Sequence, residues 1–201
     1  PLSYGSYLKG EEGNSGCDTN KAIQLLEENG WTYKYNKWQR TENYSTKTIN
    51  FKLVVQAENA TRANIAEMIK SNLEEIGMRV SIVKASESQY QYYLQNRNYD
   101  MILTGITQSA SPNLETFFGE NNLANFSNEE VSTIMNEVKN ITKEDLLKEK
   151  YGRLRQIYNE EVPYIGLYNS YYAIVSSWNL KGNITANWYN IFMDINNWYK
   201  N

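Results

Sequence analysis

Between residues 47 and 107, segments typical of strands alternate with segments typical of helices. Strand character, with β-branched residues that alternate with polar ones or run together, is found at residues 47–56, 78–84 and 99–107. Two intervening segments, 61–75 and 86–96, place apolar residues at helical spacing. Thr61 or Asn59 can cap the first helix and Gly77 would end it, and Ser86-x-x-Gln89 has the form of a capping box before the second. This order is typical of βαβ units. We therefore predict an α/β fold whose mainly parallel sheet is flanked by helices.

The flanking segments extend this pattern. Asp18 or Thr19 can cap a helix that ends at Glu28, and the polar, aromatic residues 31–46 suggest a loop or a short hairpin arm. Further along, Ser127-x-x-Glu130 and Thr142-x-x-Asp145 have the form of capping boxes and predict helices at about 128–139 and 143–160. Pro163 is predicted to begin another strand, and a short turn is expected near 114–118.

Composition argues against several classes of function, although it does not exclude catalysis by carboxylates. The 201 residues suit one domain, or one domain with a tail from another. A net charge of −3 argues against nucleic-acid binding, which calls for a basic surface. The chain has no histidine, the usual general base and commonest metal ligand, and no nucleophile or phosphate-binding motif. We therefore predict no catalytic residues, no metal, no cofactor and no enzymatic activity.

The start of the sequence suggests a piece of a longer protein, and the single cysteine suggests no attachment site. Cys17 follows no apolar run, so we interpret it as a plain thiol rather than a lipid-attachment site. No stretch approaches the roughly 18 consecutive apolar residues of a membrane span. The sequence starts at Pro1 without Met or a signal peptide, so we expect any targeting segment to lie upstream.

The candidate binding site lies where the predicted strands end. In open α/β sheets, ligands bind outside the carboxyl ends of the strands, which here are followed by loops after Gln56, Lys84 and Gly105. The third loop, 106–113, is rich in small, uncharged residues that form hydrogen bonds. It is either half of a binding cleft or an ordinary surface connection capped by Pro112.

Four segments occur in an order that resembles a known family. They are "AIQLLEENGW" at 22–31, "LEEIGMRVSIV" at 73–83, "YDMILTG" at 99–105 and "YGRLRQIYNEEVPYIGLY" at 151–168. Together they resemble the C-terminal lobe of the family 5 extracellular solute-binding proteins of oligopeptide and dipeptide ABC importers. The resemblance implies a type II periplasmic-binding-protein-like lobe followed by a C-terminal return segment.

The resemblance also implies boundaries and partners. Residues 1–169 would form the C-terminal ligand-binding lobe, with a hinge near Asn169. Residues 170–201 would return to pack on a missing N-terminal lobe of the same protein. The implied partners are a peptide or small-solute ligand and the subunits of a membrane permease. The implied location is extracellular, as a membrane-anchored lipoprotein, and the Asn, Lys, Ile and Tyr content suggests a Gram-positive source.

The site residues that the resemblance implies come from two of the three loops. We predict substrate contacts from Gln56, Ala57, Gly105, Ile106, Thr107, Gln108, Ser109, Ala110 and Ser111. Many family members carry "G-W-x-x-D-x-x-P" here, with an Asp for the ligand's ammonium group, but Ile106 replaces the Trp and Ser109 stands near the Asp position. Arg62 is a possible anion contact, although an Arg that is solvated or paired with Glu58 is the commoner case.

The predicted function is therefore that of the substrate-binding component of an ABC importer. It would capture peptides or related small solutes between two lobes and deliver them to the permease. The alternative is a non-transport surface sensor or adhesion module that kept the fold, which the serine at position 109 favours slightly.

Overall fold

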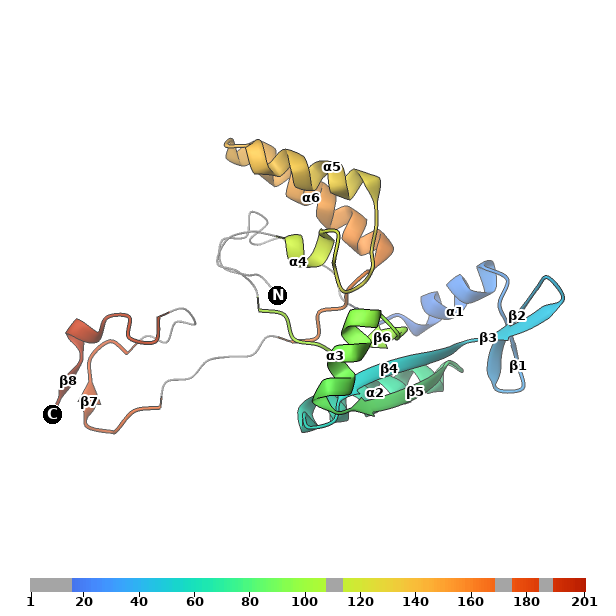
Figure 1. Cartoon of the computed structure of the whole chain (residues 1–201), viewed down its shortest axis with the longest axis horizontal. Coiled ribbons are helices and arrows are strands. Elements are labelled where there is room, and N and C mark those ends of the chain that lie inside the picture. Colours follow the sequence, from blue (N-terminus) through green and yellow to red (C-terminus); the bar gives the residue numbers. More distant parts are fainter. Residues whose placement is uncertain (1–15, 108–113, 169–174, 185–189) are drawn as a thin grey trace. The chain divides into compact units, whose positions relative to one another are not determined.

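The computed structural model describes residues 16–107, 114–168, 175–184 and 190–201. The chain divides into two compact units, Leu2–Pro163 and Tyr164–Asn201, and each is described by itself (Figure 1).

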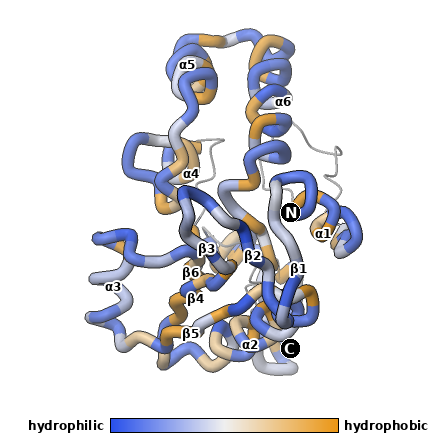
Figure 2. Tube along the Cα trace, turned by 90° about the vertical axis from the view of Figure 1, so that its right-hand side faces the viewer, coloured by the Kyte–Doolittle hydropathy of each residue, from blue (hydrophilic) through white to orange (hydrophobic). Residues whose placement is uncertain are grey.

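The first unit is built on a parallel sheet. β4 (Asn50–Gln56) lies in the middle, between β5 (Arg79–Ala85) and β6 (Met101–Ile102), and pairs in parallel with both. Three consecutive residues of β4, Leu53, Val54 and Val55, are almost completely buried. A continuous apolar run is typical of a strand covered on both faces, and Figure 2 shows this hydrophobic stretch along β4. The predicted α/β fold with a parallel sheet is confirmed.

One helix covers each face of the sheet. α2 (Ala60–Glu75) packs Ala66, Ile69 and Leu73 against Leu53, Val55 and Val80 of the strands. α3 (Glu87–Asn96) packs Tyr90 against the opposite face, where Val54 and Ala85 point. Successive side chains of a strand point to opposite faces, so β4 contributes to both clusters.

Sequence signals set the ends of these helices. The Asn59 side chain caps α2 by accepting a hydrogen bond from the N–H of Arg62 at 2.9 Å. Ser86 and Gln89 form the predicted capping box of α3. Before the sheet, α1 (Thr19–Glu28) begins after Asp18, whose carboxylate accepts from the Lys21 N–H at 2.9 Å.

The segment before β4 is a three-stranded antiparallel meander. It consists of β1 (Thr32–Lys34), β2 (Lys37–Glu42) and β3 (Ser45–Thr48). The prediction of one strand over 47–56 is therefore wrong. The run is divided between β3 and β4 because residues up to Thr48 pair with β2, whereas residues from Asn50 pair with β5.

Two aromatic residues attach the meander to the end of α2. The Trp38 side chain is buried and donates its Nε1–H to the Ile76 carbonyl at 2.6 Å. The Tyr33 ring lies over Gly77, where an ideal Cβ would be only 2.1 Å from its Cε2 atom. Gly77 also has φ +83°, a conformation that favours glycine.

β6 is much shorter than the predicted strand 99–107. Only Met101 and Ile102 pair with β4, and single hydrogen bonds from the Asp100 and Leu103 N–H groups to β4 carbonyls extend the contact. The predicted length was wrong because only Met101 and Ile102 find paired partners on β4, a limit that the pattern of residues 99–107 does not show. The chain leaves the sheet at Thr104, two residues beyond the last paired one.

A helical part follows in the same unit. It contains α4 (Glu115–Phe118), α5 (Glu129–Glu137), the 3₁₀ turn η1 (Val138–Asn140) and α6 (Glu144–Glu161). α5 and α6 share a buried apolar cluster, formed by Val131, Ile134, Met135, Leu154 and Ile157.

The predicted capping boxes of these two helices are wrong. Asn128, not Ser127, caps α5 by accepting from the Val131 N–H at 3.1 Å. Lys143 occupies the N-cap position of α6 without a side-chain hydrogen bond. Glu130, assigned to the first box, instead reaches across to α6.

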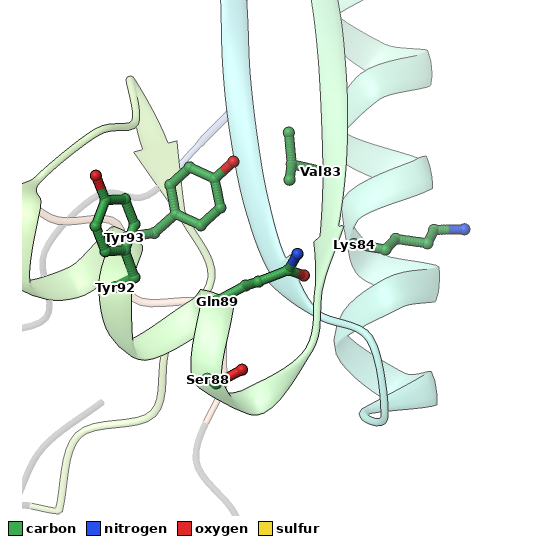
Figure 3. A pocket seen from close by; sticks show the side chains of 6 residues that line it. All are labelled: Val83, Lys84, Ser88, Gln89, Tyr92 and Tyr93. Carbon is green, nitrogen blue, oxygen red and sulfur yellow. The ribbon is translucent and has the colours of Figure 1, made fainter.

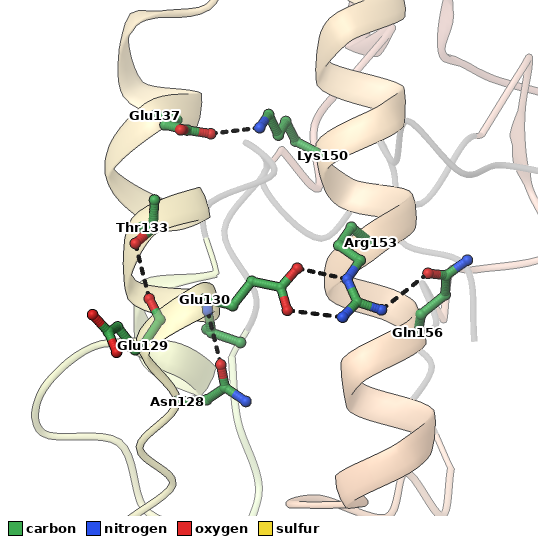
Figure 4. A network of polar contacts seen from close by, with 9 residues as sticks. Asn128, Glu129, Glu130, Thr133, Glu137, Lys150, Arg153 and Gln156 are labelled. Atoms are coloured by element: carbon green, nitrogen blue, oxygen red, sulfur yellow. Dashed lines mark hydrogen bonds and ion pairs between the residues drawn. The ribbon is translucent and has the colours of Figure 1, made fainter.

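Ion pairs join the exposed sides of α5 and α6 (Figure 4). Arg153 holds Glu130 through two contacts, Nε to Oε1 at 2.6 Å and Nη2 to Oε2 at 2.8 Å. Lys150 Nζ lies 2.6 Å from Glu137 Oε2. The hydrogen bond from the Arg153 guanidinium, with help from its charge and that of Lys150, holds the pKa of Glu130 below its usual range.

The second unit shows little regular structure in its described residues, 164–168, 175–184 and 190–201. It contains β7 (Leu180–Lys181), antiparallel to β8 (Tyr199–Lys200), and the 3₁₀ turn η2 (Ile195–Asn197). The strand predicted from Pro163 is wrong for residues 163–168, which form no strand in the structure. Asn169, the predicted hinge, lies outside the described residues, so the boundaries 1–169 and 170–201 stay predictions.

Candidate functional site

The parallel strands bring three chain segments to one edge of the sheet. β4, β5 and β6 run in the same direction, so the residues that follow Gln56, Ala85 and Ile102 emerge at their common carboxyl edge. The Ala57 N–H donates to the Ala85 carbonyl at 2.8 Å and keeps the ends of β4 and β5 together. This edge is where an open α/β sheet binds ligands.

Gln56 is the central polar residue of the edge. Its side chain is half-buried at the last position of β4. The amide oxygen Oε1 accepts a hydrogen bond from Arg62 Nη1 at 3.3 Å, and the amide nitrogen Nε2 donates to Glu87 Oε2. One amide group therefore connects the first turn of α2 with the first turn of α3.

Arg62 reaches this position because of the cap of α2. Asn59 fixes the first turn of the helix, and the half-buried Arg62 side chain then returns toward the strand ends. Its Nη2 atom is 2.7 Å from where a Cβ on Gly105 would be, so the guanidinium lies against the segment that follows β6. The predicted pairing of Arg62 with Glu58 is wrong, because Gln56 accepts the hydrogen bond of Arg62 and no carboxylate of the described residues lies within 4.0 Å.

Glu87 is a residue of this edge that sequence reasoning missed. The capping box of Ser86 and Gln89 begins α3 directly after β5, which places Glu87 in the first helical turn. Its carboxylate accepts from Gln56 Nε2 and, at 2.8 Å, from Gln91 Nε2. The signal was in the sequence, because a capping box next to a predicted strand end locates the next side chain at the carboxyl edge.

The predicted contact residues that the structure describes follow the strands that form this edge. Gln56 ends β4 and Ala57 follows it, and Gly105, Ile106 and Thr107 come after β6, with Ile106 half-buried and Thr107 exposed. The remaining predicted residues, Gln108, Ser109, Ala110 and Ser111, lie outside the described residues. That any of these side chains contacts a ligand stays a prediction.

A separate hollow lies beside β5 and α3 (Figure 3). It has a volume of about 490 Å³ and is lined by Val83, Lys84, Ser88, Gln89, Tyr92 and Tyr93. The Lys84 side chain points away from the others, toward α2, where it pairs with Glu67 at 3.1 Å. Because neither Gln56 nor Gly105 lines this hollow, we do not assign it to the carboxyl edge.

The tyrosine of α3 nearest the edge has a packing role. Tyr90 is buried and donates its hydroxyl to the Leu103 carbonyl at 2.7 Å, so it holds the chain just beyond β6.

No group of three or more acidic, cysteine or histidine side chains suited to a metal ion occurs in the described parts of the chain. The arrangement suits recognition of a polar or charged solute through hydrogen bonds.

The sequence matches a known family model. The model of the bacterial extracellular solute-binding proteins, family 5 Middle, matches residues 1–125. The chain belongs to this family. Family 5 is one of binding proteins rather than enzymes. No curated protein matches this chain.

Solved structures agree with the family at the level of the fold. The oligopeptide-binding protein AppA from Bacillus subtilis, in complex with a nonapeptide, has a TM-score of 0.73 and 20% identity, covering 100% of this chain and 41% of AppA. NikZ from Campylobacter jejuni, in complex with Ni(L-His), has a TM-score of 0.67 and 19% identity, and the match covers 91% of this chain and 39% of NikZ. The mannohexaose-bound oligopeptide-binding protein from Thermotoga maritima has a TM-score of 0.64 and 19% identity, and the match covers 74% of this chain and 30% of that protein.

These neighbours establish the fold class of this family 5 chain. It is the type II periplasmic-binding-protein-like α/β fold. The chain spans about two fifths or less of the length of AppA, NikZ and the Thermotoga maritima protein. Among the described residues, no helix combines the length and the hydropathy needed to cross a bilayer.

Proposed function

We propose that this chain belongs to the substrate-binding component of an ABC importer that captures peptides or related small solutes. The observation that carries the proposal is the carboxyl edge, where Gln56, Arg62 and Gly105 come together from separate elements. This lobe and a second one would close around the ligand, and the loaded protein would deliver it to the permease. Residues 170–201 would pack on the second lobe, and a lipid anchor on a Gram-positive cell surface would hold the protein at the membrane.

The chemistry of the edge supports a ligand held through its backbone. A peptide importer must accept many side chains, and main-chain hydrogen bonds provide a grip that all peptides share. Gly105 has no side chain that would shield its own N–H and C=O groups from such contacts, and the sequence after it is rich in small, uncharged residues. The neighbours include a nonapeptide complex, a mannohexaose complex and a Ni(L-His) complex, so peptides are the proposed class and sugars or metal complexes are the competing ones.

The test is to identify the natural cargo. Protein expressed from the complete gene is purified without unfolding, and solute released by denaturation is identified by mass spectrometry. The proposal predicts that peptides co-purify and that a peptide mixture raises the melting temperature. Melting shifts with oligosaccharides or nickel–histidine alone would overturn the peptide class, and no shift with any solute would point to a non-transport role.

A matched pair of variants locates the binding. Gln56→Ala removes the amide that connects α2 and α3, and it should abolish most of the melting shift. Gln24→Ala removes a comparable side-chain amide from α1. The Gln24 Nε2 atom donates to Glu28 Oε1 at 2.7 Å, and the residue is far in sequence from the strand ends. It should leave the shift unchanged, and equal losses in both variants would place binding elsewhere.

A further inference from the structure

The carboxyl edge presents two opposite charges on the two sides of one amide group. Arg62 donates to the oxygen of the Gln56 side chain, and Glu87 accepts from its nitrogen. Neither charge has a counter-ion within 4.0 Å among the described residues. The edge therefore holds a separated pair of charges rather than a closed ion pair.

Both charged groups have hydrogen-bonding capacity left. A guanidinium carries five N–H donors, and the described contacts of Arg62 use one of its side-chain groups, at a long 3.3 Å. A carboxylate can accept about four hydrogen bonds, and Glu87 accepts two, both from neutral amides. An anion that reached the half-buried Arg62 guanidinium would accept charge-assisted hydrogen bonds from the donors that the described contacts leave unused.

Gln56 explains why the two charges do not close on each other. Its amide occupies the position between them, with each end turned to the group of complementary polarity. Gln91 holds the second carboxylate oxygen of Glu87 from the next turn of α3. The separation of the two charges is thus set by the protein before any ligand arrives.

We propose that this edge recognises a zwitterionic solute, with Glu87 as the partner of its ammonium group and Arg62 as the partner of its carboxylate. The proposal rests on solute binding at this edge, the proposed function above, and it adds the charge pattern of the ligand. Glu87, which follows β5, is then the residue that determines specificity for a cationic group, and Gln56 is a positioning residue.

The simpler role for Glu87 is to stabilise α3, because an acidic residue in the first turn interacts favourably with the helix dipole. That role predicts lower helix stability on substitution and no change in ligand preference. The ammonium-binding role predicts a change in preference that depends on the ligand's amino group.

The experiment uses glycylglycine and two blocked forms as probes. Binding of glycylglycine, its N-acetyl form and its C-terminal amide is measured by NMR on the Gln56 side-chain amide and on the Arg62 guanidinium. Glu87→Gln should weaken the binding of glycylglycine and of its C-terminal amide by about tenfold or more and leave the binding of the N-acetyl form unchanged. Arg62→Gln should weaken the binding of glycylglycine and of the N-acetyl form and leave the binding of the C-terminal amide unchanged.

Glu67→Gln is the control variant. Glu67 also belongs to α2 and pairs with Lys84, so it loses a charge without touching Gln56 in the described contacts. Equal weakening by Glu67→Gln and Glu87→Gln would overturn the proposal, as would a Glu87→Gln effect that is the same for all three probes. No response of the Gln56 amide to any probe at tens of millimolar would also overturn it.

The outcomes separate this proposal from the proposed function. If a natural solute binds but Gln56 responds to none of the probes, transport binding stands and the charge pattern fails. If the probes bind with the expected preferences but no solute co-purifies with the complete protein, the charge pattern stands and the transport function fails.

Discussion

The guanidinium of Arg62 lies in the space that a side chain at residue 105 would need. Its Nη2 atom is 2.7 Å from the ideal Cβ position on Gly105, and its Nη1 atom donates to Gln56. The absence of a side chain at Gly105 is therefore what allows Arg62 to reach the end of β4.

Gly105→Ala should displace Arg62 with little cost in stability. The atom that the new methyl group meets is the far end of a flexible side chain, so the guanidinium can move and its bond to Gln56 is lost. We expect the melting temperature to change by no more than a few degrees, while any affinity for an anionic probe falls. NMR of the Arg62 side chain measures the displacement, and an unchanged spectrum would contradict the prediction.

Gly77→Ala should destabilise the protein strongly. The residue has φ +83°, and an ideal Cβ would be 2.1 Å from the Tyr33 ring, which also packs near the buried Trp38. Strain of this kind costs about 1–3 kcal/mol, measured by urea unfolding. Gly152→Ala is the opposite control, since nothing lies within 4 Å of its Cβ position inside α6 and it should stabilise by about 0.5–1 kcal/mol. The same sign for both would refute the argument.

Trp38→Phe should loosen the meander from α2. The substitution removes the Nε1–H that donates to the Ile76 carbonyl at 2.6 Å and leaves that acceptor unpaired. We expect a loss of about 1–3 kcal/mol and faster amide exchange in β2. Trp178→Phe changes a side chain that is 87% exposed and should have almost no effect on stability. A comparable loss from both changes would count against a specific role for the Trp38 bond.

Acidification should weaken the contact between α5 and α6. The pKa of Glu130 is lowered in the folded protein, chiefly by the hydrogen bond from Arg153, so the folded state binds fewer protons than the unfolded state. The stabilisation is present above the ordinary glutamate pKa and is lost as the pH falls through the lowered value. Melting curves between pH 7 and pH 3 should show a flatter pH dependence for Glu130→Gln than for the unmodified protein.

Glu129→Gln provides the control for the acid effect. Glu129 neighbours Glu130 on α5 but forms no ion pair with the described residues. Its substitution should leave the pH dependence close to that of the unmodified protein. An equally flat curve for both variants would show that the effect arises from net charge rather than from the contact with Arg153.

The sequence predicted the elements whose signals are local. The sequence offered Thr61 or Asn59 as the cap of α2, of which Asn59 is the cap in the structure, and the Ser86–Gln89 box and Gly77 marked the start of α3 and the end of α2. The length of β6 was not predictable in this way, because it depends on how many residues after α3 pair with β4 in the folded protein. The division at Ile49 likewise depends on two different pairing partners, which only the folded chain brings together.

The candidate site was predictable in place and not in its contacts. The carboxyl-edge rule located Gln56 and Gly105 from the order of strands and helices alone. The link from Arg62 through Gln56 to Glu87 joins residues up to 31 positions apart, and it follows from side-chain directions that no local pattern specifies. The family motif quoted in the sequence analysis lies in the loop after β6. It therefore gave no reason to expect that Glu87, which follows β5, belongs to the site.

The polar edge and the apolar core draw on different parts of the same elements. Gln56, Arg62 and Glu87 lie at the ends of β4, α2 and α3, whereas Leu53, Ala66 and Tyr90 form the interior further along those elements. Exchanging the end residues therefore need not disturb how the strands and helices pack. A lobe built in this way can be retuned by evolution, or by an engineer making a biosensor, for a new cargo on an unaltered scaffold.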